Sequence, residues 1–223
     1  MKKYLINYFK RIIYLVVFYG VSVANAGSYD DFFTAVQRDD AAAVKSLLAR
    51  GFDANTVDPK GLHGLYLALR EPSLKVAQVL VDWPKTNVNA LNTKDESPLM
   101  MAALRGQQAI AEKLIKKGAD VNKTGWAPLH YAASNGHLAL MALLLENSAY
   151  IDAESPNGTT PLMMAAMYGT SEAVKLLIDE GADPQLKNQQ GLTALQFAQR
   201  GNRPDAGGLI AAAIRRKRPA GQW

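Results

Sequence analysis

The side chains that most often carry chemistry are scarce in this sequence and poorly spaced for it. Its histidines are His63, His130 and His137, and it has no cysteine that could serve as a nucleophile or a metal ligand. His130 and His137 are seven positions apart, a spacing that does not make a ligand pair on one helix face. We therefore predict no catalytic residue, no metal site and no cofactor.

The acidic residues do not suggest a catalytic pair either. Three acidic pairs are adjacent in the sequence, so their side chains point apart in a helix: Asp39-Asp40, Asp95-Glu96 and Asp179-Glu180. The sequence contains no P-loop, no dinucleotide fingerprint and no nucleophile elbow. These observations favour a binding protein over an enzyme.

Two short helices with a tight turn are predicted between residues 158 and 183. Thr160 and Pro161 indicate a helix start, because the hydroxyl can accept from a free backbone N–H and proline lacks an N–H of its own. Gly169 lets the chain turn, and a second helix is predicted over about residues 171–180, with Gly181 just after its end. One unit is therefore two antiparallel helices and a loop.

This unit recurs along the chain. An anchor leucine follows each first-helix start, at spacings of 34, 30, 33 and 33 residues: Leu65, Leu99, Leu129, Leu162 and Leu195. An alanine stands three residues after each anchor leucine: Ala68, Ala102, Ala132, Ala165 and Ala198. A small side chain there lets adjacent helices approach closely. Because one unit cannot bury its apolar face alone, we predict a stack of copies.

The recurring pattern resembles the ankyrin-repeat family, whose first helix begins with Thr-Pro-Leu-His. It is matched by SPLMMAALRG from Ser97, GWAPLHYAASNG from Gly125 and, more loosely, GLTALQFA from Gly191. The resemblance implies an all-α solenoid of about six helix-turn-helix repeats with short β-hairpin loops, over residues 28–56, 57–90, 91–122, 123–153, 154–186 and 187–214. It also implies that His130 has a structural hydrogen-bonding role across repeats, and it says little about function by itself.

The first 26 residues are predicted to be a cleavable signal peptide. Four basic residues precede an apolar stretch at 12–23, and Ala24-Asn25-Ala26 forms an A-x-A cleavage site. The alternative, an uncleaved membrane anchor, is disfavoured because twelve apolar residues span only about 18 Å of a roughly 30 Å hydrocarbon core. We expect export, to the bacterial periplasm or else by a eukaryotic secretory route, and no stable membrane span after cleavage.

Most of the apparent basicity lies at the two ends of the chain. The formal net charge is +5, but the leader and the run Arg215-Arg216-Lys217-Arg218 each carry four basic residues, so residues 27–214 sum to −3. A broad basic surface is absent from that body, which argues against nucleic-acid binding. We predict a basic C-terminal tail over residues 215–223, either solvated or bound to an anionic partner.

The loop before the fourth repeat is three residues short. Only Lys123 and Thr124 stand between Asn122 and Gly125, and Ala127 takes the place of a capping hydroxyl. The shortening is either a tolerated deletion at an exposed loop tip or a notch that admits a partner.

Exposed positions on the first helices and loops are the candidate binding residues. The resemblance places them three before, and five and six after, each anchor leucine: Leu62, Arg70, Glu71, Glu96, Leu104, Arg105, Trp126, Ser134, Asn135, Thr159, Met167, Tyr168, Leu192 and Arg200. Leu104, Trp126, Met167 and Tyr168 are expected to form a central patch flanked by arginines. Alternatively, Trp126 packs over the shortened loop.

We therefore predict a non-catalytic protein-binding module in the bacterial periplasm. We expect a monomer whose groove binds another exported or envelope protein. One alternative is an inhibitor or immunity-type factor that blocks a partner enzyme. A small-ligand or enzymatic site between repeats is less favoured.

Overall fold

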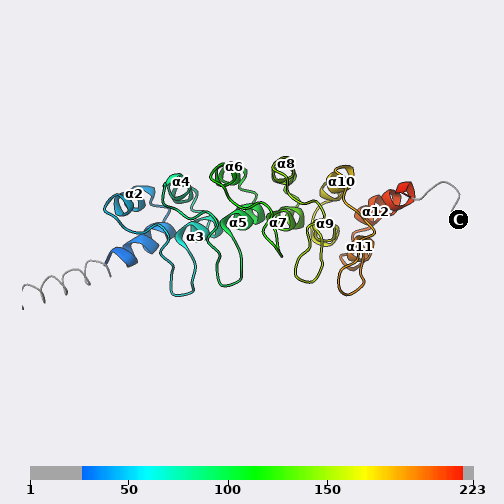
Figure 1. Cartoon of the computed structure of the whole chain (residues 1–223), viewed down its shortest axis with the longest axis horizontal. Coiled ribbons are helices and arrows are strands. Elements are labelled where there is room, and N and C mark those ends of the chain that lie inside the picture. Colours follow the sequence, from blue (N-terminus) through cyan, green and yellow to red (C-terminus); the bar gives the residue numbers. More distant parts are fainter. Residues whose placement is uncertain (1–26, 218–223) are drawn as a thin grey trace, which may run out of the picture.

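Two rows of short helices run along the molecule (Figure 1). The computed structural model describes residues 27–217; the predicted leader, with Ala24 and Ala26, and residues 218–223 lie outside that range. The inner row, next to the projecting loops, contains residues 27–37, α3 (Gly64–Arg70), α5 (Pro98–Arg105), α7 (Pro128–Asn135), α9 (Pro161–Tyr168) and α11 (Ala194–Arg200). The outer row contains α2 (Ala41–Ala49), α4 (Leu74–Asp82), α6 (Gln108–Lys116), α8 (Leu138–Glu146), α10 (Ser171–Asp179) and α12 (Pro204–Lys217).

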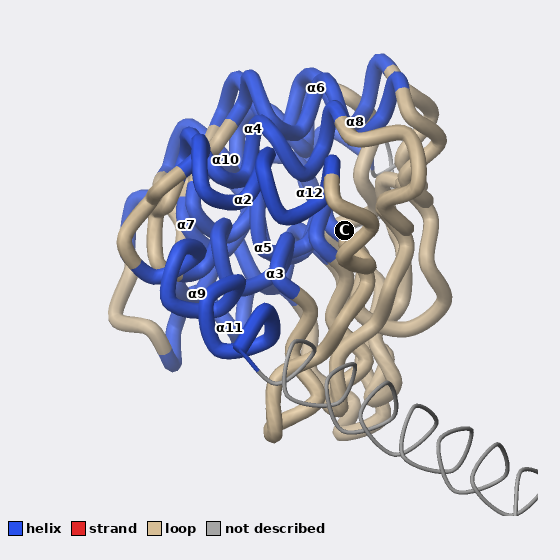
Figure 2. The backbone as a smooth tube through the Cα atoms, turned by 90° about the vertical axis from the view of Figure 1, so that its left-hand side faces the viewer, coloured by secondary structure: helices blue, strands red, loops and turns tan. Residues whose placement is uncertain are grey.

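The six helix pairs confirm the predicted all-α solenoid of about six repeats. From α3 onward, each helix packs against its partner and against the equivalent helix of the next repeat. A view along the stack shows helices on one side and loops on the other (Figure 2). The alanines three residues after the anchor leucines are all at most 1% exposed, as expected for a close helix contact. Of the anchor leucines, Leu195 alone is only partly buried, because no further inner helix covers α11 within residues 27–217.

The inner helices α5 and α9 begin at residues whose side chains cap them, as the sequence indicates. The hydroxyls of Ser97 and Thr160 accept the backbone N–H groups of Met100 and Met163 at 3.2 and 3.4 Å. The methionine sulfur atoms in turn accept the N–H groups of Ser97 and Thr160. Methionine therefore serves here as a capping residue as well as a core side chain.

His130 supplies this function where Ala127 cannot. Its Nδ1 accepts the Ala127 N–H at 3.1 Å, and its Nε2 lies 2.9 Å from the Thr159 carbonyl oxygen in the next repeat. The first bond requires an acceptor and the second a donor, so the ring is the neutral tautomer with hydrogen on Nε2. Burial lowers the pKa of His130 below its usual value. The structural role across repeats that the resemblance implies is thus present.

Polar side chains and single backbone hydrogen bonds, and not β-strands, close the projecting loops. The predicted β-hairpin loops are present as loops, but residues 27–217 contain no strand and a single isolated bridge, Val57 with His63. The first residue of three loops accepts the backbone N–H groups two and four residues later, at 2.8–3.0 Å: Asp58, Asn92 and Asn188. Such local bonds satisfy the backbone without a strand ladder.

An asparagine at the base of a loop clamps the following repeat. Asn55 Oδ1 accepts the Asn87 N–H at 2.7 Å, and Asn55 Nδ2 donates to the Lys85 carbonyl at 2.9 Å. Asn89 and Asn122 make the same pair of bonds in the next two repeats, at 2.7–2.9 Å. These bonds hold consecutive repeats together outside the apolar core.

The last helix is longer than predicted. The basic tail was expected to begin at residue 215, but α12 continues to Lys217. Cations in the last turn of a helix oppose its dipole, which favours continuing the helix through Arg215 and Arg216. The rest of the predicted tail lies outside the described residues.

We predict that His130 makes stability depend on pH. Its pKa is lowered in the folded protein, so below the ordinary value of 6.5 the unfolded chain binds a proton that the folded chain does not. The His130 contribution to stability is therefore complete above pH 6.5 and is lost as the pH falls below it. His130→Gln should remove this dependence, because glutamine retains an acceptor, as Gln196 does for the Thr193 N–H. Urea unfolding of both proteins between pH 7.5 and 5 tests it, and parallel pH profiles would refute it.

Loss of an asparagine clamp should weaken the stack. Asn89→Ala removes the partners of the Asp120 N–H and the Gly118 carbonyl, so we expect the free energy of unfolding to fall by about 1–2 kcal/mol. Asn147→Ala is the matched control, since the Asn147 side chain bonds to Leu143 within its own repeat. Urea midpoints followed by circular dichroism measure the difference; equal midpoints for the two variants would contradict the clamp.

Candidate functional site

Most of the predicted binding residues lie at the surface, but two do not. Leu62 is 7% exposed and Thr159 is 2% exposed, so the prediction that these two positions are exposed is wrong. Leu62 packs into the core, and Thr159 is held by the Ser155 hydroxyl and by His130. The others are exposed or half-buried: Arg70, Glu71, Glu96, Leu104, Arg105, Trp126, Ser134, Asn135, Met167, Tyr168, Leu192 and Arg200.

The expected central patch is divided between the two ends of the inner helices. Trp126 stands just before α7, whereas Leu104, Met167 and Tyr168 lie at the ends of α5 and α9. An eight-residue helix such as α7 is about 12 Å long, so Trp126 is roughly a helix length from the level of the others. The structure therefore does not gather these four side chains into one patch.

The ends of the inner helices carry a partly charged surface. Arg105 Nη2 donates to the Arg70 carbonyl at 2.6 Å, and the Arg70 guanidinium binds the Glu71 carboxylate at 2.8 Å. Tyr168 is the most exposed large hydrophobic side chain here, with 56% of its surface accessible. Leu104 is half-buried against the core.

A second group, here called the Glu96 cluster, lies at the starts of the inner helices and comes from three repeats. The Glu96 Oε2 atom accepts the Tyr66 hydroxyl at 2.6 Å and the Asn92 Nδ2 at 2.8 Å, and Oε1 lies 3.5 Å from the Tyr131 hydroxyl. The Trp126 ring meets the Tyr131 ring edge to face at a centroid distance of 6.4 Å. Glu96, Trp126 and Tyr131 are half-buried, and Tyr66 is buried beneath them.

Both tyrosines of the Glu96 cluster stay protonated at neutral pH. Burial, followed by the hydrogen bond and charge of Glu96, raises the pKa of Tyr66 well above its usual range. Burial and the charge of Glu96 raise the pKa of Tyr131 to about 12. The phenols can therefore donate hydrogen bonds to the carboxylate but are unsuited to proton abstraction near pH 7.

Glu96 and Trp126 were among the predicted binding residues, whereas Tyr66 and Tyr131 were not. Tyr131 belongs to a column two residues after the anchor leucines, whose other members are apolar: Leu67, Met101, Met164 and Phe197. Tyr131, Met164 and Phe197 are half-buried, whereas Leu67 and Met101 are buried. The sequence could have indicated Tyr131, because its column recurs with the same spacing as the anchor leucines.

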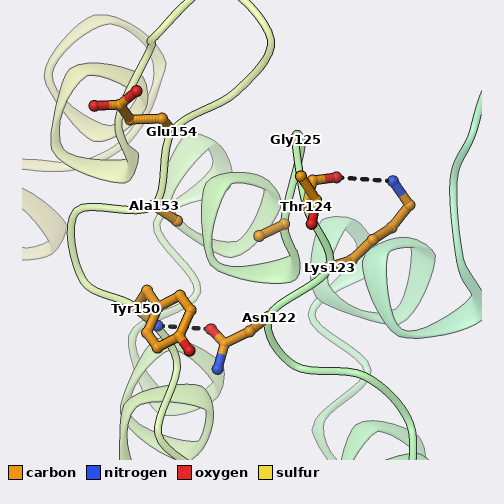
Figure 3. A pocket seen from close by; sticks show the side chains of 8 residues that line it. Asn122, Lys123, Thr124, Gly125, Tyr150, Ala153 and Glu154 are labelled. Atoms are coloured by element: carbon orange, nitrogen blue, oxygen red, sulfur yellow. Dashed lines mark hydrogen bonds between the residues drawn. The ribbon is translucent and has the colours of Figure 1, made fainter.

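A cavity lies between the shortened loop before α7 and the loop that follows α8. In keeping with its shorter length, the loop before α7 projects less than its neighbours (Figure 1). The cavity has a volume of about 240 Å³ and is lined by Asn122, Lys123, Thr124, Gly125, Ala127, Tyr150, Ala153 and Glu154. Figure 3 shows Lys123 and Glu154 on opposite sides of it, with the Lys123 ammonium on the Thr124 carbonyl at 3.0 Å. Both interpretations of the shortened loop stay predictions.

The described part of the chain has neither a cluster of metal ligands nor a membrane-spanning helix. No three histidine or acidic side chains within residues 27–217 lie close enough together to hold a metal ion. None of the helices in the same range is long and apolar enough to cross a membrane. The described residues that stand out on chemical grounds are therefore those of the Glu96 cluster and the helix-end surface around Tyr168.

Comparison with known proteins places the chain among repeat proteins. The family described as "Ankyrin repeats (3 copies)" matches residues 32–124, 65–155 and 129–215. A putative ankyrin repeat protein of Escherichia coli strain K12 is 30% identical over 193 residues, covering 82% of this chain and 95% of that protein. The nuclear factor NF-kappa-B p105 subunit of Gallus gallus is 32% identical over 71% of this chain, which spans only 17% of that longer protein.

A solved structure shares the arrangement of the repeats. It is described as a predatory endopeptidase from Bdellovibrio bacteriovorus in complex with an immunity protein, and one of its chains matches with a TM-score of 0.71 and 28% identity. The match covers 82% of this chain and 97% of that chain. The family match extends over nearly all of residues 27–217, and two of its three ranges begin at the anchor leucines Leu65 and Leu129. The chain belongs to the ankyrin-repeat family.

Proposed function

We propose that this chain is a non-catalytic binding protein that holds a folded partner protein against its inner helices and loops. The observation that carries the proposal is the Glu96 cluster, in which side chains from three repeats form a polar and aromatic surface. Tyrosine and tryptophan dominate the binding energy of protein interfaces, particularly where they are already ordered. Tyr168, at the other end of the inner helices, offers a second, separate exposed aromatic side chain on the same row of helices.

The stack supplies binding energy by being ordered in advance. The asparagine clamps and the buried alanines fix the positions of neighbouring inner helices before any partner arrives. The side chains on them therefore lose little conformational entropy on association. Affinity should then depend on a few central side chains more than on the total area covered.

The proposal places this binding in the bacterial periplasm. Its support is the sequence of the first 26 residues, with basic, apolar and A-x-A segments in the order of a signal peptide. The absence of cysteine suits an oxidising compartment, where unpaired thiols would form wrong disulfides. The partner would be another exported or envelope protein, bound by a monomer.

A second candidate is an immunity-type inhibitor of an exported peptidase. It is favoured by the similarity to the endopeptidase–immunity protein complex, where the match takes in 97% of the matched chain. A rigid surface with projecting loops can cover the entrance of an active site and exclude substrate. This function is a special case of the first, because it also requires a bound partner protein.

Removal of one exposed tyrosine side chain should weaken partner binding without lowering the stability of the fold. Tyr168→Ala should lower recovery of the partner by about tenfold or more and leave the melting temperature unchanged, because Tyr168 is 56% exposed. Leu74→Ala is the matched control, since Leu74 is 46% exposed but lies on α4 in the outer row. Recovery is measured by tagging the C-terminus in the native host, cross-linking mildly and quantifying the partner by mass spectrometry. Equal recovery with both variants, or background alone, would count against the proposal.

The same preparation tests export and inhibition. The intact mass should correspond to a chain that begins at Gly27, since cleavage is expected after Ala26. If the recovered partner is a peptidase, adding this protein should abolish its activity at about one equivalent, and Tyr168→Ala should require at least about tenfold more. A peptidase partner that stays fully active when saturated would exclude the inhibitor and leave the binding role intact.

A further inference from the structure

Hydrogen bonds from its own loop and from helix α3 hold the carboxylate of Glu96 in one position. On the loop side, Asn92 Oδ1 accepts the Glu96 backbone N–H at 3.0 Å, and Asn92 Nδ2 binds Glu96 Oε2. On the helix side, the Tyr66 hydroxyl binds the same oxygen at 2.6 Å. Oε2 thus has two short donors, whereas Oε1 has only the 3.5 Å contact with Tyr131. One oxygen of an oriented carboxylate therefore retains capacity to accept.

No cation of the described residues neutralises this carboxylate. The ion pairs found within residues 27–217 are Arg70–Glu71, Lys113–Asp82, Lys123–Asp95 and Lys175–Asp179, and Glu96 belongs to none of them. Arg70 is near enough to act on Tyr66, but its guanidinium binds Glu71. Lys123, the basic residue of the shortened loop, is occupied by Asp95 and the Thr124 carbonyl. The half-buried Glu96 carboxylate thus has only neutral hydrogen-bond donors. A positively charged group bound to it would stabilise its negative charge.

Aromatic rings stand next to the open oxygen. Tyr131 touches Glu96 Oε1 with its hydroxyl, and the Trp126 ring packs on Tyr131 at 6.4 Å and on His130 at 5.3 Å. Trp126 and Tyr131 each keep part of their surface exposed. Aromatic faces attract cations, with tryptophan the strongest, and they pack well along the aliphatic stem of lysine or arginine.

We propose that Glu96, Tyr131 and Trp126 form a recognition site for one basic side chain, arginine or lysine, of the partner protein. The inference rests on the proposed protein-binding function and names the chemistry that it recognises. The cation binds Glu96 Oε1, and its stem or guanidinium plane lies against Tyr131 and Trp126. Residues 27–214 carry a net charge of −3, which complements a basic partner segment.

The test uses small molecules that carry only the recognised group. The probes are N-acetyl-arginine amide, N-acetyl-lysine amide and the neutral N-acetyl-citrulline amide, titrated into the purified protein to about 50 mM. The readout is the nuclear magnetic resonance signal of the Trp126 indole N–H, assigned with a Trp126→Phe variant. We expect saturable shifts with one or both basic probes and at least fivefold weaker shifts with citrulline. A preference between arginine and lysine identifies the side chain.

Variants separate the site from general electrostatics. Glu96→Gln preserves the acceptor for Tyr66 and should reduce binding of the basic probes to the citrulline level. Glu172→Gln removes the same charge from an exposed position on α10 and should leave binding unchanged. No saturable shift, equal response to citrulline, or equal loss in both variants would overturn the inference. The proposed function is judged separately, since recovery of a partner that depends on Tyr168 would stand even then.

Discussion

Close contact between inner helices, made possible by buried alanines, is the constraint on which the rest of this structure depends. With a methyl group at Ala102 or Ala132, the backbones approach until polar groups of one repeat reach carbonyls of the one before. Gln107 binds the Leu69 carbonyl at 3.0 Å, and His137 binds the Leu104 carbonyl at 3.1 Å. At Gly169 the approach is closest, because an added Cβ would lie 2.3 Å from the Ala133 carbonyl oxygen. The loop clamps and the Glu96 cluster also require this spacing.

The sequence predicted the elements well because its signals are local and repeated. Thr160 with Pro161 marks a helix start through bonds that form within one turn, and the shortened loop follows from counting residues. The loops lack the expected strands because Asp58, Asn92 and Asn188 satisfy the backbone themselves, an outcome that depends on loop conformation more than on composition. The C-terminal end of α12 was not predicted correctly, because a helix that ends gradually has no sharp sequence signal.

The candidate site was harder to predict because it depends on distances between repeats. Their positions relative to the anchor leucines suggested that Trp126 and Tyr168 share one patch. The two columns in fact lie at opposite ends of the inner helices. Within the Glu96 cluster, Glu96, Tyr66 and Tyr131 belong to three different columns, so no single column contains them together. Tyr66 also occupies the position of Met100 and His130, so its type suggests packing alone. A protein-binding surface in this fold can therefore combine residues of different columns and different repeats.

The asparagine clamps also bear on how such a chain reaches its native state. The bonds between repeats described above join residues 26 to 38 positions apart. Contacts of that range have the same loop-closure entropy in a long array as in a short one, because the loop never exceeds about two repeats. Contact order relative to length therefore falls as repeats are added, and folding can nucleate at any adjacent pair and propagate in either direction. Because contacts between repeats are short in sequence range, repeats can be added to an array without slowing the first step of folding.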